Sequence, residues 1–203
     1  MDTLPLRIIF LVATLWLSNT AHAAKNILVF GDSLSAGYNI AIEKGWVSLL
    51  QQELTRTKSG FNVVNASISG ETATGGRQRI AKALKQHRPA IVIVELGAND
   101  GLRGSPLKIL EANLNEIIEK SLKSGANVLL IGMKLPPNYG LAYTGQFHNI
   151  YTRLGIKHHV RVLPFLLEDV TPEQFQTDNL HPTAAAQPYI MKTVFKELAP
   201  LLR

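Results

Sequence analysis

The sequence predicts one three-layer α/β/α domain built on a five-stranded parallel sheet. Five short apolar runs alternate along the chain with stretches whose apolar residues have helical spacing. These apolar runs are continuous rather than alternating, which is typical of strands buried on both faces. Strands that alternate with helices form right-handed crossover units, and such units produce a parallel sheet covered by helices on both sides.

The predicted strands are short and rich in β-branched residues. They span residues 27–30, 61–65, 90–96, 127–132 and 160–163. The strand over 90–96 is the clearest of the five, because four β-branched residues follow one another in Ile91-Val92-Ile93-Val94. Glycine or asparagine at several strand ends indicates where the chain leaves the sheet.

Helices are predicted between these strands, in a flavodoxin-like arrangement. Apolar residues at 46, 49, 50 and 54 have helical spacing, and a second helical pattern runs from 72 to 87. Ser105 and Pro106 predict the start of a third helix, with the serine as N-cap and the proline in the first turn. An irregular segment and a helix precede the fifth strand, and a closing helix is expected over 183–198.

Composition describes an ordinary globular protein of 203 residues, with 46% hydrophobic and 18% charged residues. The chain has no cysteine, which excludes cysteine nucleophiles, disulfides and thiolate metal sites. The formal net charge is +6, but the lysines and arginines are scattered along the chain and are not interleaved with aromatic residues. We therefore expect a solvated basic surface and no nucleic-acid binding.

The first 23 residues have the pattern of a secretory signal. Arg7 precedes an uncharged apolar stretch over 8–17, and Ala21-His22-Ala23 gives an A-x-A cleavage pattern. This predicts a signal peptide over 1–23, a mature domain over 24–203, and a periplasmic or secreted location. The apolar stretch is shorter than the roughly 20 residues of a spanning helix, so we expect no stable membrane insertion.

Residues after the strands are the candidate site, because ligands of parallel sheets bind at the carboxyl ends of the strands. Ser33 directly follows the first strand, within Gly31-Asp32-Ser33-Leu34. A serine hydroxyl needs a base before it acts as a nucleophile. His181 follows Asp178 by three residues after the last strand, so one loop can carry a base and the carboxylate that orients it.

Acyl transfer also requires donors for a developing oxyanion, and the same edge offers three. Gly70 lies in a turn and can present an unobstructed backbone N–H, Asn99 has a side-chain amide, and the N–H of Ser33 is the third candidate. We interpret Asp32 as a structural hydrogen-bonding residue of its turn, and Asp100 as a brace for the loop of Asn99.

These motifs, in this order, resemble the four sequence blocks of the SGNH (GDSL) hydrolases. The resemblance rests on residues 31–35, Gly70, residues 97–100 and the pair Asp178 and His181, and it spans the chain after residue 23. Residues 31–38, 97–104, 135–140 and His181-Pro182 are similar to the bacterial periplasmic thioesterase I/protease I/lysophospholipase L1 group. The resemblance implies an arylesterase-like hydrolase with Ser33 as nucleophile, Gly70 and Asn99 as oxyanion donors, and Asp178 and His181 as triad partners.

The acyl group is expected to bind near Leu102, Leu135 and Tyr139, which follow strand ends in apolar segments. Arg103 lies between Gly101-Leu102 and Gly104. It is either a solvated loop charge or part of a mobile rim over the acyl group, since glycines permit movement.

The expected substrates are small acyl esters, thioesters and lysophospholipids, and we expect a monomer. No metal-ligand spacing or nucleotide-binding motif is found in the sequence, so no cofactor and no metal are expected. Two alternatives remain open. One is an O-deacetylase of carbohydrate or peptidoglycan on the same fold, and the other is a catalytically inactive lipid-binding module.

Overall fold

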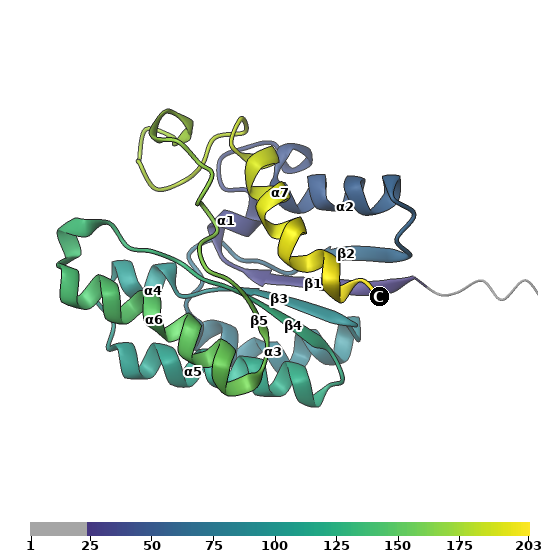
Figure 1. Cartoon of the computed structure of the whole chain (residues 1–203), viewed down its shortest axis with the longest axis horizontal. Helices are drawn as coiled ribbons and strands as arrows, with labels where there is room; N and C mark the ends of the chain where they lie inside the picture. The colour runs from purple at the N-terminus through teal and green to yellow at the C-terminus, as the bar shows by residue number, and fades with distance from the viewer. Residues whose placement is uncertain (1–23) are drawn as a thin grey trace, which may run out of the picture.

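The computed structural model describes residues 24–203 and confirms the predicted fold class (Figure 1). Five strands form one sheet in the order β2-β1-β3-β4-β5, and every neighbouring pair is parallel. The strands are β1 (Lys25–Gly31), β2 (Phe61–Asn65), β3 (Ile91–Glu95), β4 (Asn127–Ile131) and β5 (Arg161–Leu163). Each begins and ends within two residues of the strand predicted from the sequence. The signal peptide predicted over 1–23 lies outside the described residues.

Helices cover both faces of the sheet. Figure 1 shows α2 (Trp46–Arg56) and α7 (Gln187–Leu198) on one face. The other face is covered by α3 (Ala73–His87), α5 (Leu107–Lys123) and α6 (Leu141–His158). No helix within residues 24–203 combines the length and the apolar character that a bilayer crossing requires.

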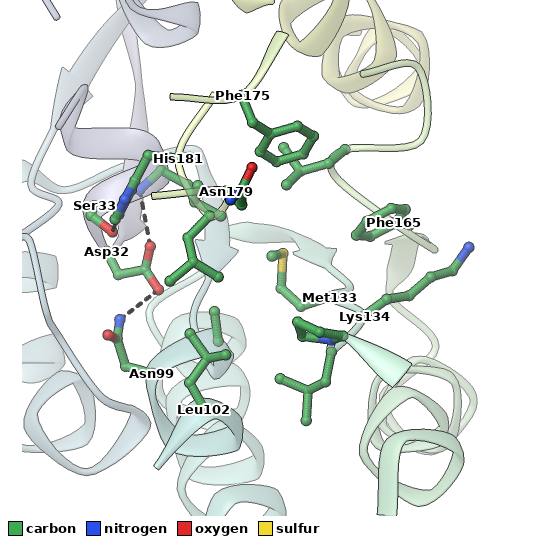
Figure 2. A pocket seen from close by; sticks show the side chains of 16 residues that line it. Asp32, Ser33, Asn99, Leu102, Met133, Lys134, Phe165, Phe175, Asn179 and His181 are labelled. Carbon is green, nitrogen blue, oxygen red and sulfur yellow. Dashed lines mark hydrogen bonds between the residues drawn. The ribbon is translucent and has the colours of Figure 1, made fainter. Parts of the chain in front are cut away.

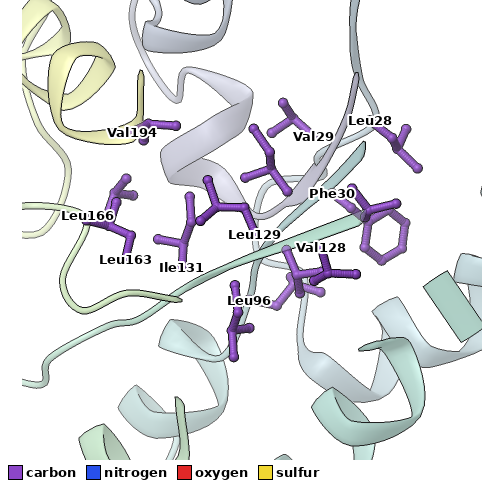
Figure 3. Packing of buried hydrophobic residues seen from close by; sticks show 14 of the residues in the cluster. Leu28, Val29, Phe30, Leu96, Val128, Leu129, Ile131, Leu163, Leu166 and Val194 are labelled. Atoms are coloured by element: carbon purple, nitrogen blue, oxygen red, sulfur yellow. The ribbon is translucent and has the colours of Figure 1, made fainter. Parts of the chain in front are cut away.

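The core lies between the sheet and these two helical layers (Figure 3). All five residues of β3 are buried, and so are the last five residues of β1. Leu129 and Ile131 of β4 pack in the same cluster as Val194 of α7, and all three are fully buried. Burial of such an aliphatic side chain contributes roughly 1.5–3 kcal/mol to the free energy of folding. The sheet is therefore a rigid base for the loops at its edges.

Two predicted helix starts are wrong. The third predicted helix, α5, begins at Leu107, and Pro106 is its N-cap residue with φ −57° and ψ 120°. Ser105 lies before this N-cap, and no side-chain hydrogen bond caps the helix. The Ser105 N–H donates to the Asp100 carbonyl oxygen at 2.9 Å, so Ser105 belongs to the preceding turn. The closing helix α7 begins at Gln187 rather than at Thr183, whose N–H donates to the Gln174 carbonyl oxygen at 2.7 Å. In both cases the residue donates its backbone N–H to a carbonyl oxygen that precedes the helix, and it lies outside the helix.

The parallel topology brings the segments that follow the strands to one edge of the sheet. The short helix α1 (Ser33–Ala36) follows β1, and the short helix α4 (Ala98–Leu102) follows β3. The segments after β4 and β5 begin at the same edge. This edge is where the sequence predicts the site.

Candidate active site

Ser33 is the first residue of α1 and lies just beyond the carboxyl end of β1, which pairs with β2 and β3 inside the sheet. Asp32 caps this helix, since its Oδ1 accepts a hydrogen bond from the Leu34 N–H at 3.1 Å. The capped turn fixes the backbone around the serine. Ser33 is 8% exposed, so its hydroxyl can be reached only from the cavity side.

Ser33, His181 and Asp178 form a hydrogen-bonded series (Figure 2 shows the first two). His181 Nε2 lies 2.8 Å from Ser33 Oγ, although the two residues are 148 positions apart in the sequence. His181 Nδ1 lies 2.7 Å from Asp178 Oδ2. The three predicted triad residues are therefore brought together with the connectivity that proton transfer from a serine requires.

Gln176 holds the loop that carries His181 against the segment that follows α1. The Gln176 N–H donates to the His181 carbonyl oxygen at 2.8 Å, and Gln176 Nε2 donates to the carbonyl oxygens of Tyr38 and Pro182. The ring of Tyr38 packs on the imidazole of His181 with centroids 4.4 Å apart. These contacts fix the position and plane of the imidazole relative to α1.

The hydrogen bonds around Asp178 favour its ionised form. Its Oδ1 accepts the backbone N–H groups of His181 at 3.0 Å and Leu180 at 2.9 Å. These two backbone hydrogen bonds are the main reason that the pKa of Asp178 is lowered to about 2. The carboxylate can therefore orient the imidazole and stabilise its protonated form throughout the neutral range.

Asn99 lies on α4, beside the turn of Ser33. Its amide nitrogen donates to Asp32 Oδ2 and to the Glu71 carbonyl oxygen, each at 3.0 Å. Gly97 caps α4 with φ +118°, and a Cβ there would lie 2.4 Å from Tyr151 Oη. Only glycine therefore permits both this backbone conformation and the close packing below the asparagine.

Gly70 and Ser33 supply backbone N–H groups beside the same turn. The segment before Gly70 runs along the end of β1, where the Ile68 N–H donates to the Gly31 carbonyl oxygen at 3.0 Å. Within residues 24–203, neither the Ser33 N–H nor the Gly70 N–H has a hydrogen-bond acceptor. Each can therefore donate to a ligand, but only Ser33 is among the residues that line the neighbouring cavity; Gly70 is not.

A cavity of about 420 Å³ opens beside Ser33 and His181 (Figure 2). Its walls are mainly apolar side chains from the segments after β3, β4 and β5 and from the loop of His181. The lining side chains are those of Leu34, Ala98, Leu102, Met133, Leu135, Pro136, Phe165, Leu167, Phe175 and Leu180, together with Asp32, Ser33, Asn99, Lys134, Asn179 and His181. The cavity can hold an apolar group whose reactive end lies at Ser33.

The four residues predicted to bind substrate are placed differently. Leu102 and Leu135 line the cavity. Tyr139 is not among the lining residues. Its hydroxyl donates to the Leu102 carbonyl oxygen at 3.0 Å, so it stabilises the backbone of a residue that does line the cavity. Arg103 is also not a lining residue, and its Nη2 donates to the Gly70 carbonyl oxygen at 3.2 Å.

Sequence reasoning did not identify the aromatic part of the cavity wall, which consists of Phe165 and Phe175. Phe165 lies two residues after β5, so its position after a strand was an available signal. Phe175 lies in an irregular loop and forms a bridge with Pro182, and no sequence periodicity marks it. Asp100 has a structural contact, since its Oδ2 accepts the Ala73 N–H at 2.8 Å at the start of α3.

Two buried carboxyl groups lie under the turn that carries Ser33. Burial raises the pKa of Asp32 to about 6, against the opposing effect of hydrogen bonds from Leu34 and Asn99. Burial also raises the pKa of Glu95 well above its usual range, and the neighbouring Asp32 raises it further. Among residues 24–203, no group of three or more histidine, aspartate or glutamate side chains is arranged to hold a metal ion.

Fold and site together define an ester-hydrolysing enzyme of the α/β class, and comparison with known proteins specifies the family. The chain belongs to the GDSL-like lipase/acylhydrolase family, whose model matches residues 29–187. It is 45% identical over 195 residues to the arylesterase of Vibrio mimicus, covering 95% of this chain and 98% of the relative.

Two further relatives extend the comparison. The chain is 42% identical over 184 residues to the thioesterase 1/protease 1/lysophospholipase L1 of Escherichia coli strain K12, covering 90% of this chain and 87% of the relative. The crystal structure of the psychrotrophic esterase EstA from Pseudoalteromonas sp., inhibited by monoethylphosphonate, superposes with a TM-score of 0.84. That comparison covers 88% of this chain and 98% of the other, at 38% identity.

Proposed function

We propose that the protein hydrolyses carboxylic esters and acyl thioesters, including lysophospholipids, through a Ser33–His181–Asp178 triad and a covalent acyl-enzyme. The observation that carries this proposal is the position of His181, which lies 2.8 Å from Ser33 Oγ and 2.7 Å from Asp178 Oδ2. The names of the relatives support the substrate classes. Inhibition of a structural relative by a phosphonate also supports an activated serine, the group that such reagents attack.

Acylation begins when His181 Nε2 takes the proton of Ser33 Oγ, and the oxygen attacks the carbonyl carbon of the substrate. Asp178 stabilises the imidazolium that forms. The negative charge on the former carbonyl oxygen is received by the N–H groups of Ser33 and Gly70 and by the Asn99 amide. When the tetrahedral intermediate collapses, the alcohol or thiol leaves with the proton from His181 Nε2.

Deacylation uses the same groups with water as the nucleophile. His181 Nε2 takes a proton from water, and the resulting hydroxide attacks the acyl carbon of the Ser33 ester. Collapse of the second tetrahedral intermediate breaks the bond to Ser33 Oγ, and the proton on His181 returns to the serine. The products are the free carboxylic acid and the original enzyme.

The cavity favours acyl chains over the deacetylase alternative. An acetyl group would leave most of a 420 Å³ apolar cavity unfilled, whereas a longer acyl chain would bury its methylene groups against Leu102, Leu135 and Phe165. Each buried methylene contributes about 0.8 kcal/mol to binding.

The proposal of export rests on the sequence pattern of the first 23 residues alone. We propose cleavage after Ala23 and a monomeric mature enzyme of residues 24–203 in the periplasm or outside the cell.

A panel of substrates tests this function. Initial rates are measured for 4-nitrophenyl esters of increasing acyl length, an acyl-CoA thioester and a lysophospholipid, with the wild type and with Ser33→Ala. We expect kcat/KM to rise from acetyl toward longer chains and to be abolished by Ser33→Ala. Highest activity on acetyl esters would favour the deacetylase, and the absence of turnover on the whole panel would favour an inactive binding module.

A further inference from the structure

Beneath the triad lie two carboxyl groups that the proposed steps do not use. Asp32 and Glu95 are both fully buried. Glu95 is the last residue of β3, and its Oε2 accepts hydrogen bonds from the Asp32 N–H at 3.2 Å and from Ser35 Oγ at 2.7 Å. A Cβ at Gly31 would lie 2.5 Å from Glu95 Oε2, so the strand end has room for this carboxyl group only because residue 31 is glycine. The turn that presents Ser33 is thus built around Glu95.

Asp32 links this buried group to the oxyanion asparagine. One carboxyl oxygen caps α1 by accepting the Leu34 N–H, and the other accepts the Asn99 amide at 3.0 Å. Asn99 Nδ2 also donates to the Glu71 carbonyl oxygen at 3.0 Å. An amide nitrogen carries two hydrogens, and in the structure both are engaged.

An oxyanion can receive a hydrogen bond from Asn99 only by replacing one of these two acceptors. The bond to the carboxylate of Asp32 is charge-assisted and buried, whereas the bond to Glu71 ends on a neutral backbone carbonyl. The Glu71 contact is therefore the one that an oxyanion displaces. Glu71 also directly follows Gly70, so the displaced carbonyl lies next to the second proposed oxyanion donor.

We propose that Asp32, held in place by Glu95, is the positioning residue for Asn99: it keeps one amide hydrogen while the other moves from the Glu71 carbonyl oxygen to the oxyanion. This inference rests on the proposed function, in which Asn99 is an oxyanion donor. It assigns Asp32 an effect on the transition state, in addition to its role as the N-cap of α1.

The hydrogen bond from Asn99 requires that Asp32 Oδ2 carry no proton. A proton on Oδ2 would place a donor opposite the donor Nδ2 of Asn99 and would force the amide to turn. The titratable groups that act on Asp32 are Glu95 on β3, Asp100 on α4, Tyr151 on α6 and His181 on its loop. Burial and the neighbouring Asp32 both raise the pKa of Glu95, whereas the hydrogen bonds that Asp32 accepts from Leu34 and Asn99 favour its charged form.

The experiment measures kcat, KM and Tm for Asp32→Asn, Asp32→Ser and Asn99→Ala, and for each Asp32 variant combined with Asn99→Ala. Serine can still cap α1 but is too short to reach Asn99, so it separates the cap from the anchoring of the amide. Asp169→Asn is the matched control, since Asp169 accepts a hydrogen bond from Thr193 outside the site. It should leave kcat unchanged.

We expect both Asp32 variants to lower kcat by roughly 10–100-fold, less than the complete loss of an oxyanion donor, with KM changed less than about twofold. In the Asn99→Ala background the same Asp32 substitutions should lower kcat by less than about threefold, because Asp32 acts through Asn99. The acid limb of kcat/KM should also be less steep in the Asp32 variants, since one of the two groups that must lose a proton is absent.

Equal losses in the two backgrounds would overturn the inference, and so would a normal kcat for Asp32→Ser. The proposed function would survive either result if Asn99→Ala still lowers kcat. A normal kcat for Asn99→Ala would remove the asparagine from the oxyanion site and overturn the inference, whereas the proposed ester hydrolysis would be overturned only by full activity of Ser33→Ala or by the absence of turnover in the wild type.

Discussion

Replacing Asp178 with asparagine tests the triad with little disturbance of the fold. Asparagine keeps a carbonyl oxygen that can accept the N–H groups of Leu180 and His181, as Asp178 Oδ1 does. Its amide nitrogen then replaces Oδ2, which lies 2.7 Å from His181 Nδ1. Because an amide donates, it favours the tautomer in which Nδ1 is the acceptor and Nε2 carries the proton. In that tautomer His181 cannot take the proton of Ser33.

The expected loss of activity is large. An asparagine in place of the triad aspartate lowers kcat by roughly 10⁴-fold in a well-studied serine protease, through the same change of tautomer. We expect Asp178→Asn to lower kcat by about 10³–10⁴-fold, which corresponds to about 4–5.5 kcal/mol of transition-state stabilisation.

The expected loss of stability is small. The pKa of Asp178 is lowered from 3.8 to about 2, chiefly by backbone hydrogen bonds from His181 and Leu180. The full shift would be worth about 2 kcal/mol, but the side chain is 37% exposed, and solvent screening reduces this to less than about 1 kcal/mol. Because the folded-state pKa is lowered, this stabilisation is present above pH 3.8 and is lost as the pH falls through about 2.

The two quantities are measured on one preparation at neutral pH. A loss of about 1 kcal/mol lowers the melting temperature by about 2–4 °C in a domain of this size. A kcat within about tenfold of the wild type at an unchanged melting temperature would contradict this role of Asp178, since the tautomer would then have no effect on the base. A large fall in melting temperature would show instead that Asp178 acts mainly on the fold.

Three further predictions concern the oxyanion, the acyl cavity and the N-terminus. Asn99→Ala should lower kcat by roughly 10²–10³-fold with little change in KM; steady-state kinetics beside a melting curve check this, and a near-normal kcat would remove Asn99 from the site. Leu135→Ala removes part of the cavity wall and should shift the preferred acyl length more than it changes thermal stability. The ester panel measures this preference, and an unchanged preference would place the acyl chain elsewhere. N-terminal sequencing of the exported protein should begin at Ala24-Lys25, whereas recovery of Met1 would contradict cleavage after Ala23.

The fold, and the proximity of Ser33, Asp178 and His181, could be predicted because both depend on local signals and on the parallel topology. Continuous apolar runs marked the strands, and parallel topology places every strand end at one edge. Residues that directly follow strands, such as Ser33 and Asn99, are therefore near one another whatever the details of packing. Asp178 and His181 share one short loop, so their mutual distance was also a local property.

Features that depend on individual hydrogen bonds of the folded chain were not predictable in this way. Ser105 and Pro106 have the residue types of a helix start, but a hydrogen bond to the Asp100 carbonyl oxygen holds Ser105 in the preceding turn. Tyr139 lies in an apolar segment after β4, yet its hydroxyl donates to the Leu102 carbonyl oxygen and its side chain does not line the cavity. The link from Glu95 through Asp32 to Asn99 joins residues from two strand ends, and no spacing along the chain indicates it.

The central claim is that Ser33 forms a covalent bond to the acyl group during turnover. Wild-type protein is mixed with an excess of a 4-nitrophenyl ester, quenched with acid within the first turnover, digested and analysed by mass spectrometry, beside Ser33→Ala and His181→Ala. We expect the mass of one acyl group on the peptide that contains Ser33, strongly reduced in His181→Ala and absent in Ser33→Ala. An acyl group on another residue, or a burst of 4-nitrophenol from Ser33→Ala equal to that of the wild type, would contradict it.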